Sequence, residues 1–214
     1  MKLDIILSGV GGQGILSIAA IIGEASLREG LHIKQAEVHG MSQRGGDVQS
    51  NLRISSNPIH SDLIAKGTAD AILSLEPMEA LRYIPYLSDE GWVVTNISPF
   101  VNIPNYPELD NILEELSSLP NVILLDVDAI AKEAKVSRAA NMVLLGAASV
   151  ILGIEASKLE GAIAQVFGRK GESVVDMNIK AFREGQSAGR KQVENKRNDS
   201  CLSCLRNEIS GSTG

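Results

Sequence analysis

The stretch LDIILSGVGGQGILSIAAII, residues 3–22, decides the fold. It begins with a short apolar run, residues 3–8, which is typical of a buried strand. Glycines follow, and residues 15–29 then have the apolar spacing of a helix, with Gly30 placed to end it. A strand, a glycine turn and a helix in this order form the opening unit of an α/β sheet.

The rest of the chain repeats this alternation of strand and helix patterns. The predicted strands after the first cover residues 32–38, 47–55, 69–75, 92–97 and 122–127, and the predicted helices cover residues 77–87, 139–153, 158–167 and 172–187. We therefore predict an α/β fold, a Rossmann-like three-layer sandwich with a mostly parallel sheet and helices on both faces.

Composition limits the class of protein. A length of 214 residues, 44% apolar and 21% charged, fits one globular domain and excludes a chain that is disordered throughout. A net charge of −6 with 3% aromatic residues argues against nucleic-acid binding. The longest apolar stretch, residues 139–154, is shorter than the roughly 20 residues that span a bilayer. We expect a cytoplasmic protein with neither a nucleic-acid nor a membrane partner.

The end of the chain differs from the rest. Residues 190–214 carry five basic and three acidic side chains and show no apolar period. We predict a domain over residues 1–188 and a polar, disordered tail over residues 189–214. The tail contains both cysteines, Cys201 and Cys204. Since two cysteines are too few for an iron–sulfur cluster or a zinc site within one chain, we predict no metal site.

The glycine turn after the first strand satisfies the pattern G-x-G-x-x-G. The turn consists of Gly9, Val10, Gly11, Gly12, Gln13 and Gly14. Such glycines permit positive φ angles, and the helix start behind them offers free N–H groups to an anion. Glu37, at the end of the second predicted strand, stands where a ribose-binding acid would sit. The pattern suggests nucleotide or phosphate binding, and a turn used only for packing is the alternative.

A second polar cluster, EVHGMSQRGG over residues 37–46, follows the second predicted strand. In a parallel sheet it would lie at the same edge as the glycine turn, where ligands of such folds bind. Its candidate residues are His39, Ser42, Gln43 and Arg44, with Glu37, Gly45 and Gly46 beside them. The planar fork of Arg44 suits a carboxylate or a phosphate. A solvated surface loop is the alternative.

Polar residues also occur at the start of an apolar helix and directly after a buried strand. Asn141 lies early in an apolar helix, and a buried amide there must find a partner, either a loop or a ligand. Asp126 and Asp128 follow a buried strand, and we expect one of them to cap the next helix.

The glycine turn and the residue 37–46 cluster together, with LRI at 52–54 and ANMVLLG at 140–146, resemble a known family. They are similar to the gamma domain of 2-oxoacid:ferredoxin oxidoreductases, the pyruvate/ketoisovalerate oxidoreductase group, and most of all to its indolepyruvate type. The resemblance covers residues 1–188. It implies a small (beta) subunit that is inactive alone. The expected reaction converts an aryl pyruvate and coenzyme A to acyl-CoA and CO2, with electrons passed to ferredoxin.

The resemblance also implies where the chemistry lies. Thiamine diphosphate and the iron–sulfur clusters are expected in a larger alpha subunit, and no cofactor is expected in this chain alone. In this family the glycine pattern does not imply NAD. We expect His39, Ser42, Gln43 and Arg44 to reach the shared active site, with Arg44 on the oxo-acid carboxylate or a coenzyme A phosphate. The remaining residues would shape the cofactor-binding edge: Gly9, Gly11, Gly12, Gln13, Gly14, Glu37, Gly45, Gly46 and Asn141.

Two alternatives remain open. One is a self-contained NAD(P)-dependent oxidoreductase built on the glycine pattern and Glu37. The other is a scaffold domain without catalytic residues.

Overall fold

The computed structural model describes the backbone of residues 1–39, 46–101 and 103–211, and their side chains except at position 39 and beyond 196. In these residues one sheet has the strand order β2-β3-β1-β4-β5-β6. The strands are β1 (Lys2–Val10), β2 (His32–His39), β3 (Asp47–Ser55), β4 (Ala69–Ser74), β5 (Leu87–Asn96) and β6 (Val122–Leu125). Each of the six overlaps a predicted strand, but β5 begins at Leu87, earlier than the predicted start at residue 92.

One strand of this sheet runs against the others. β1, β4, β5 and β6 pair in parallel, whereas β3 pairs antiparallel with both β1 and β2. The prediction of a mostly parallel sheet is therefore confirmed, with β3 as the reversed member. Its insertion means that β2 does not neighbour β1. β2 ends and β3 begins at the carboxyl edge of the parallel strands, the edge where β1 also ends.

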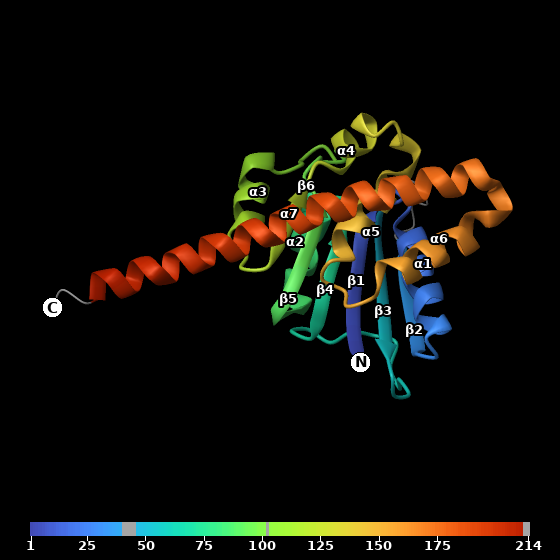
Figure 1. Cartoon of the computed structure of the whole chain (residues 1–214), viewed down its shortest axis with the longest axis horizontal. Helices are drawn as coiled ribbons and strands as arrows, with labels where there is room; N and C mark the ends of the chain where they lie inside the picture. Colours follow the sequence, from blue (N-terminus) through green and yellow to red (C-terminus); the bar gives the residue numbers. More distant parts are fainter. Residues whose placement is uncertain (40–45, 102, 212–214) are drawn as a thin grey trace.

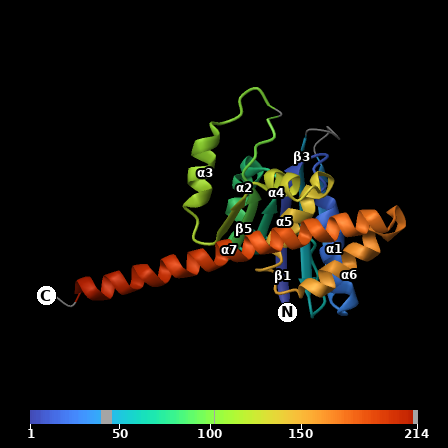
Figure 2. The ribbon, with the colours of Figure 1, turned by 45° about the horizontal axis from the view of Figure 1, so that its top comes forward.

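Helices cover both faces of the sheet, which confirms the three-layer arrangement. The helices are α1 (Ile15–Arg28), α2 (Pro77–Tyr83), α3 (Leu109–Ser117), α4 (Val127–Glu133), α5 (Ala140–Ala148), α6 (Ala156–Phe167) and α7 (Glu172–Gly211). Ile5 and Leu7 of β1 face the core formed with α1, α5, α6 and α7, and Ile6 faces the core formed with α2 and α3. Figure 1 and Figure 2 show these two helical layers from different directions.

The apolar helix α5 is enclosed between the sheet and α7. A Cβ atom at Gly146 would lie 1.9 Å from the carbonyl oxygen of Phe182 in α7. A Cβ atom at Gly185 would lie 1.9 Å from the carbonyl oxygen of Val143 in α5. The two helix backbones therefore touch, and glycine is needed at both positions.

Helix α7 is longer than the sequence predicts. It continues past Ser187 to Gly211, through the stretch that we expected to be a disordered tail. The Gln192 Oε1 atom accepts from the Leu124 N–H of the edge strand β6 at 3.0 Å, and its amide nitrogen donates to the Leu124 carbonyl. Lys196 donates to the carbonyl oxygens of Leu119 and Pro120. The expectation of disorder is wrong up to Lys196, because polar side chains fasten the helix there. The division of the chain at residue 188 stays a prediction.

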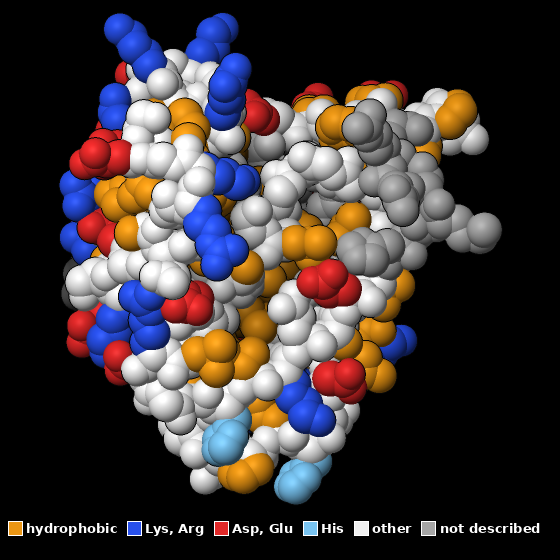
Figure 3. Space-filling view, turned by 90° about the vertical axis from the view of Figure 1, so that its right-hand side faces the viewer, with side chains coloured by type: hydrophobic (Ala, Val, Ile, Leu, Met, Phe, Trp, Pro, Cys, Tyr) orange, Lys and Arg blue, Asp and Glu red, His pale blue; other side chains and the backbone are white. Residues whose placement is uncertain are grey.

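Among the described residues, no helix combines the length and apolar character that crossing a membrane requires. On the face that carries α1 and α6, basic, acidic and apolar side chains are interspersed (Figure 3).

Candidate functional site

The glycine turn lies between β1 and α1 and needs glycine at two positions for its backbone. Gly12 has a φ of 106° and Gly14 a φ of 85°, both in the left-handed region. Gly14 is also the N-cap of α1, and no side chain caps that helix start. The predicted turn is confirmed as a local structure.

Gln13 uses both ends of its carboxamide inside this turn. Its Oε1 atom accepts from the Val10 N–H at 2.7 Å, and its Nε2 atom donates to the Leu75 carbonyl at 3.0 Å. A Cβ atom at Gly9 would lie 2.9 Å from that Oε1 atom, so the glycine leaves room for the carboxamide. Gln13 thus bridges the carboxyl ends of β1 and β4.

This bridge stands at the switch point of the sheet. α1 follows β1 onto one face and α2 follows β4 onto the other. In open α/β sheets a dinucleotide binds in the crevice between two such strands. Here the Gln13 carboxamide spans that crevice, which disfavours the NAD alternative.

Asn141, at the start of α5, forms a hydrogen bond to the last residue of the glycine turn. Its Nδ2 atom donates to the Gly14 carbonyl at 3.1 Å. A Cβ atom at Gly14 would lie 2.7 Å from the same Nδ2 atom, so α5 approaches the turn closely. Of the two partners expected for this amide, a loop or a ligand, the structure shows the loop.

The two sequence motifs meet at one backbone hydrogen bond. The Gly11 N–H donates to the Gly46 carbonyl at 2.9 Å, which places the end of the second motif against the glycine turn. His39 ends β2 opposite Val48 of β3. Ser42, Gln43, Arg44 and Gly45 lie outside the described residues, as does the His39 side chain, so their roles stay predictions.

Glu37 does not lie where a ribose-binding acid would. It pairs with Ser50 of β3, and β3 separates it from β1. Two strand spacings place it about 10 Å from β1, whereas the second strand of a Rossmann fold lies beside the first. Its Oε1 atom accepts from Gln35 Nε2 at 2.7 Å. A contact between Glu37 and a cofactor stays a prediction.

A cavity of about 240 Å³ opens beside the glycine turn. It is lined by Gly12, Gln13, Leu75, Asn96, Val127, Asp128, Ser137, Arg138, Ala140 and Asn141. The lining comes from the carboxyl ends of parallel strands and from the starts of α4 and α5. Arg138 forms no ion pair with another described residue and brings a positive charge to the rim. The cavity can hold a group as large as a carboxylate or a phosphate.

The two acidic residues that follow β6 have different roles. Asp126 caps α4 by accepting from the Ala129 N–H at 2.8 Å, which confirms the cap. Asp128 lines the cavity and accepts from Asn96 Nδ2 at 3.2 Å. Asn96, Ser137 and Arg138 were not predicted. The one available signal was Asn96, a polar residue near the end of a predicted strand.

A buried carboxylate organises the loop beside this cavity. Glu76 is fully buried at the end of β4 and caps α2 by accepting from the Glu79 N–H at 2.8 Å. Its other oxygen accepts from the Phe100 N–H at 3.3 Å and from the Tyr106 hydroxyl. Burial and the neighbouring Glu76 raise the pKa of Tyr106 well above its ordinary value. The phenol therefore stays protonated and keeps donating.

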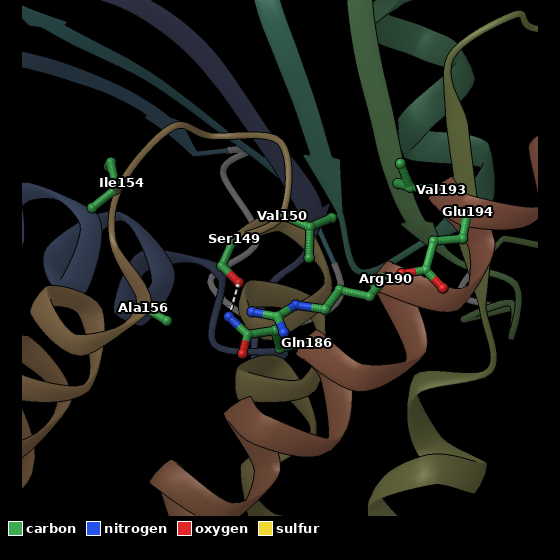
Figure 4. A pocket seen from close by; sticks show the side chains of 8 residues that line it. All are labelled: Ser149, Val150, Ile154, Ala156, Gln186, Arg190, Val193 and Glu194. Atoms are coloured by element: carbon green, nitrogen blue, oxygen red, sulfur yellow. Dashed lines mark hydrogen bonds between the residues drawn. The ribbon is translucent and has the colours of Figure 1, made fainter. Parts of the chain in front are cut away.

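A second crevice lies far from this edge. It has a volume of about 330 Å³ and runs between α7 and the segment joining α5 to α6 (Figure 4). Gln186 Nε2 donates there to Ser149 Oγ at 3.0 Å, and Arg190 and Glu194 of α7 also line it. Because α5 separates it from the glycine turn, it does not belong to the candidate site. Among the residues whose side chains are described, no group of acidic, His or Cys residues is arranged to hold a metal ion.

Comparison with known proteins finds a matching family model and similar relatives. Residues 4–188 match the family model described as pyruvate ferredoxin/flavodoxin oxidoreductase. The indolepyruvate oxidoreductase subunit IorB of Archaeoglobus fulgidus is 40% identical over 196 residues, which cover 86% of this chain and 94% of that protein. The subunit IorB of Methanothermobacter thermautotrophicus is 36% identical over 195 residues, 88% of this chain and 98% of that protein.

A solved structure shares the fold. It is the 2-oxoglutarate:ferredoxin oxidoreductase of Magnetococcus marinus with 2-oxoglutarate, coenzyme A and succinyl-CoA bound, with a TM-score of 0.70 and 25% identity. The match covers 89% of this chain but only 31% of that longer chain.

Proposed function

Because the chain belongs to the pyruvate ferredoxin/flavodoxin oxidoreductase family, we propose that it is the small (beta) subunit of an indolepyruvate-type 2-oxoacid:ferredoxin oxidoreductase. The observation that carries the proposal is the similarity to IorB subunits, at 36–40% identity over nearly their whole length. The assembled enzyme would convert an aryl pyruvate and coenzyme A to acyl-CoA and CO2 and pass the electrons to ferredoxin. We place the complex in the cytoplasm.

The redox chemistry belongs to the partner in this proposal. Thiamine diphosphate, which stabilises the carbanion left by decarboxylation, and the iron–sulfur clusters, which carry electrons, would reside in a larger alpha subunit. The two cysteines of this chain are too few to ligate a cluster. This chain would bind and orient the substrates at the shared site.

The carboxyl edge of the sheet is the part of this chain that we assign to the shared site. The segment between β2 and β3 is tied to the glycine turn through Gly46. From there Arg44 would hold the carboxylate of the oxo acid or a phosphate of coenzyme A, since a guanidinium binds either with two parallel hydrogen bonds. His39, Ser42 and Gln43 would orient the same group by hydrogen bonds. Arg138 offers a second cation at the rim of the neighbouring cavity.

The proposal is tested by kinetics of the assembled enzyme. The chain is co-expressed with the larger thiamine-binding subunit, and reduction of ferredoxin is measured with indolepyruvate, pyruvate and 2-oxoglutarate in turn. We expect the highest kcat/KM with indolepyruvate. Arg44→Ala is expected to raise the KM of the oxo acid or of coenzyme A about tenfold or more, by loss of a charged hydrogen-bond pair.

The matched control is Arg28→Ala, an exposed arginine in the last turn of α1, at the end of that helix opposite to the glycine turn. It should leave both KM values unchanged. If Arg44→Ala also leaves both unchanged, the role of Arg44 is refuted while the subunit assignment stands.

A further inference from the structure

Three large apolar side chains stand exposed on the segment between β5 and α3. Phe100 is 44% exposed, Val101 66% and Ile103 41%. We call these three residues the apolar loop. Figure 2 shows this segment extending beyond the neighbouring helices α2 and α3. A cluster of exposed apolar side chains on one loop is unusual for a free surface and is typical of an interaction site.

The segment that carries the apolar loop has no charge. Between Glu90 and Glu108 the sequence contains no acidic or basic residue. A surface that covers these side chains would therefore meet no charge from this segment that it must desolvate. The matching surface on a partner should be apolar as well.

The apolar loop is held in place from inside the protein. The fully buried Glu76 accepts from the Phe100 N–H and from the Tyr106 hydroxyl. At the start of the segment the Ile97 N–H donates to the Leu125 carbonyl at 2.9 Å, and Ser98 Oγ donates to Asp126 Oδ1 at 3.3 Å. A loop fixed before binding loses less conformational entropy on binding, as an interface anchor requires.

The apolar loop borders the candidate site. The Ser98 N–H donates to Asn96 Oδ1, and Asn96 lines the cavity beside the glycine turn. A protein that covered the loop would thus also stand over the edge to which we assign the substrates.

The length of the Magnetococcus chain indicates which protein covers the apolar loop. In the Magnetococcus chain the same fold is 31% of the length, so a much larger part of that enzyme belongs to the same polypeptide. In the IorB subunits, by contrast, the matched region makes up 94–98% of the chain, and the present chain has an anchored apolar loop at its candidate site. We propose that Phe100, Val101 and Ile103 insert into an apolar pocket of the larger subunit and form the anchor of the subunit interface. This inference rests on the proposed function.

Charge insertion at the apolar loop tests the proposal. The variants are Val101→Asp and Phe100→Asp, and the matched control is Leu63→Asp. Leu63 is 59% exposed and lies between β3 and β4, at the opposite edge of the sheet. Affinity for the purified larger subunit is measured by surface-immobilised binding with each full-length variant. We expect the dissociation constant to rise about tenfold or more for both loop variants and less than about twofold for the control.

Two further measurements on the free subunit complete the test. Circular dichroism and the melting temperature should be the same for the wild type and Val101→Asp, because the Val101 side chain is 66% exposed. Sedimentation of the wild-type subunit alone should show a monomer at all concentrations. A dimer that Val101→Asp dissociates would assign the loop to a second copy of the chain and overturn the proposal. Loop variants that bind the larger subunit as tightly as the wild type would also overturn it. If the wild type fails to bind the larger subunit at all, the proposed function itself fails, and this inference fails with it.

Discussion

Gln13 is the residue that most clearly separates this glycine turn from a nucleotide-binding one. Its carboxamide satisfies the Val10 N–H and the Leu75 carbonyl, at the ends of two strands that lead to opposite faces of the sheet. Both groups are main-chain groups, so the bridge fixes the backbone around the candidate site. Because Gly9 has no Cβ atom, there is space beside it for the Gln13 carboxamide.

Gln13→Ala is expected to lower the free energy of unfolding by about 1–3 kcal/mol, because the Val10 N–H loses its bond to Gln13 and the Leu75 carbonyl keeps only the longer bond from Asn96 Nδ2. Urea unfolding measures the change. Gln165→Ala is the control, since Gln165 is an exposed residue of α6 and should change stability by no more than about 0.5 kcal/mol. Equal effects of the two substitutions would show that the bridge contributes nothing.

The contacts of a single residue can be predicted from sequence when a polar residue stands in an otherwise apolar segment. An amide in an apolar helix must find a partner, and Asn141 does so at the glycine turn. Glu76 gives no such signal, because an acid before Pro77 looks like an ordinary exposed helix cap. Its burial depends on a loop that begins about twenty residues later and folds over it, which a local pattern does not contain.

Two elements are placed by tertiary contacts that periodicity does not show. The alternation in residues 47–55 predicts a strand, but alternation is the same for either direction, so the reversal of β3 and its place beside β1 could not be predicted. Helix α7 continues past residue 187 without an apolar period, because polar side chains fasten it to β6. The short helices α3 and α4 were also missing from the predicted elements.

The close contact between α5 and α7 predicts the effect of adding a methyl group at Gly146. Gly146→Ala places a methyl group against the backbone of Phe182, which cannot yield without separating the helices. We expect a loss of about 3 kcal/mol of stability, the upper end for overpacking, measured by urea unfolding.

Gly161→Ala in α6 is the matched control, because its Cβ would meet only the end of the Arg28 side chain at 3.5 Å. Since alanine favours helix more than glycine does, this variant should gain roughly 0.5–1 kcal/mol. A tolerated Gly146→Ala would mean that α5 and α7 can move apart at little cost.

Three features of the molecule lie together at the carboxyl edge of the parallel strands. The glycine turn, the cavity with Arg138 and the apolar loop all lie where the parallel strands end. The fold class and this edge could be predicted from the alternation of strands and helices. The cavity could not, because its lining comes from segments spread between residues 12 and 141.

The same arrangement predicts the response to dinucleotides. Gln13 spans the switch point and Glu37 lies beyond β3, so saturating NAD should leave the melting temperature of the chain unchanged in a thermal-shift titration. A ligand that binds the folded state at 100 times its dissociation constant would stabilise it by about 2.7 kcal/mol. A clear rise of the melting temperature with NAD, absent with an equal concentration of nicotinamide alone, would restore the self-contained oxidoreductase as the better assignment.

The contact of Gln192 with β6 also bears on how the protein behaves at high concentration. β6 ends the sheet, and an end strand normally offers its free N–H and carbonyl groups to any extended peptide. Because the Gln192 carboxamide occupies both main-chain groups of Leu124, a strand from another molecule finds no partner at that position. The long last helix therefore blocks the addition of a further strand at this position of β6.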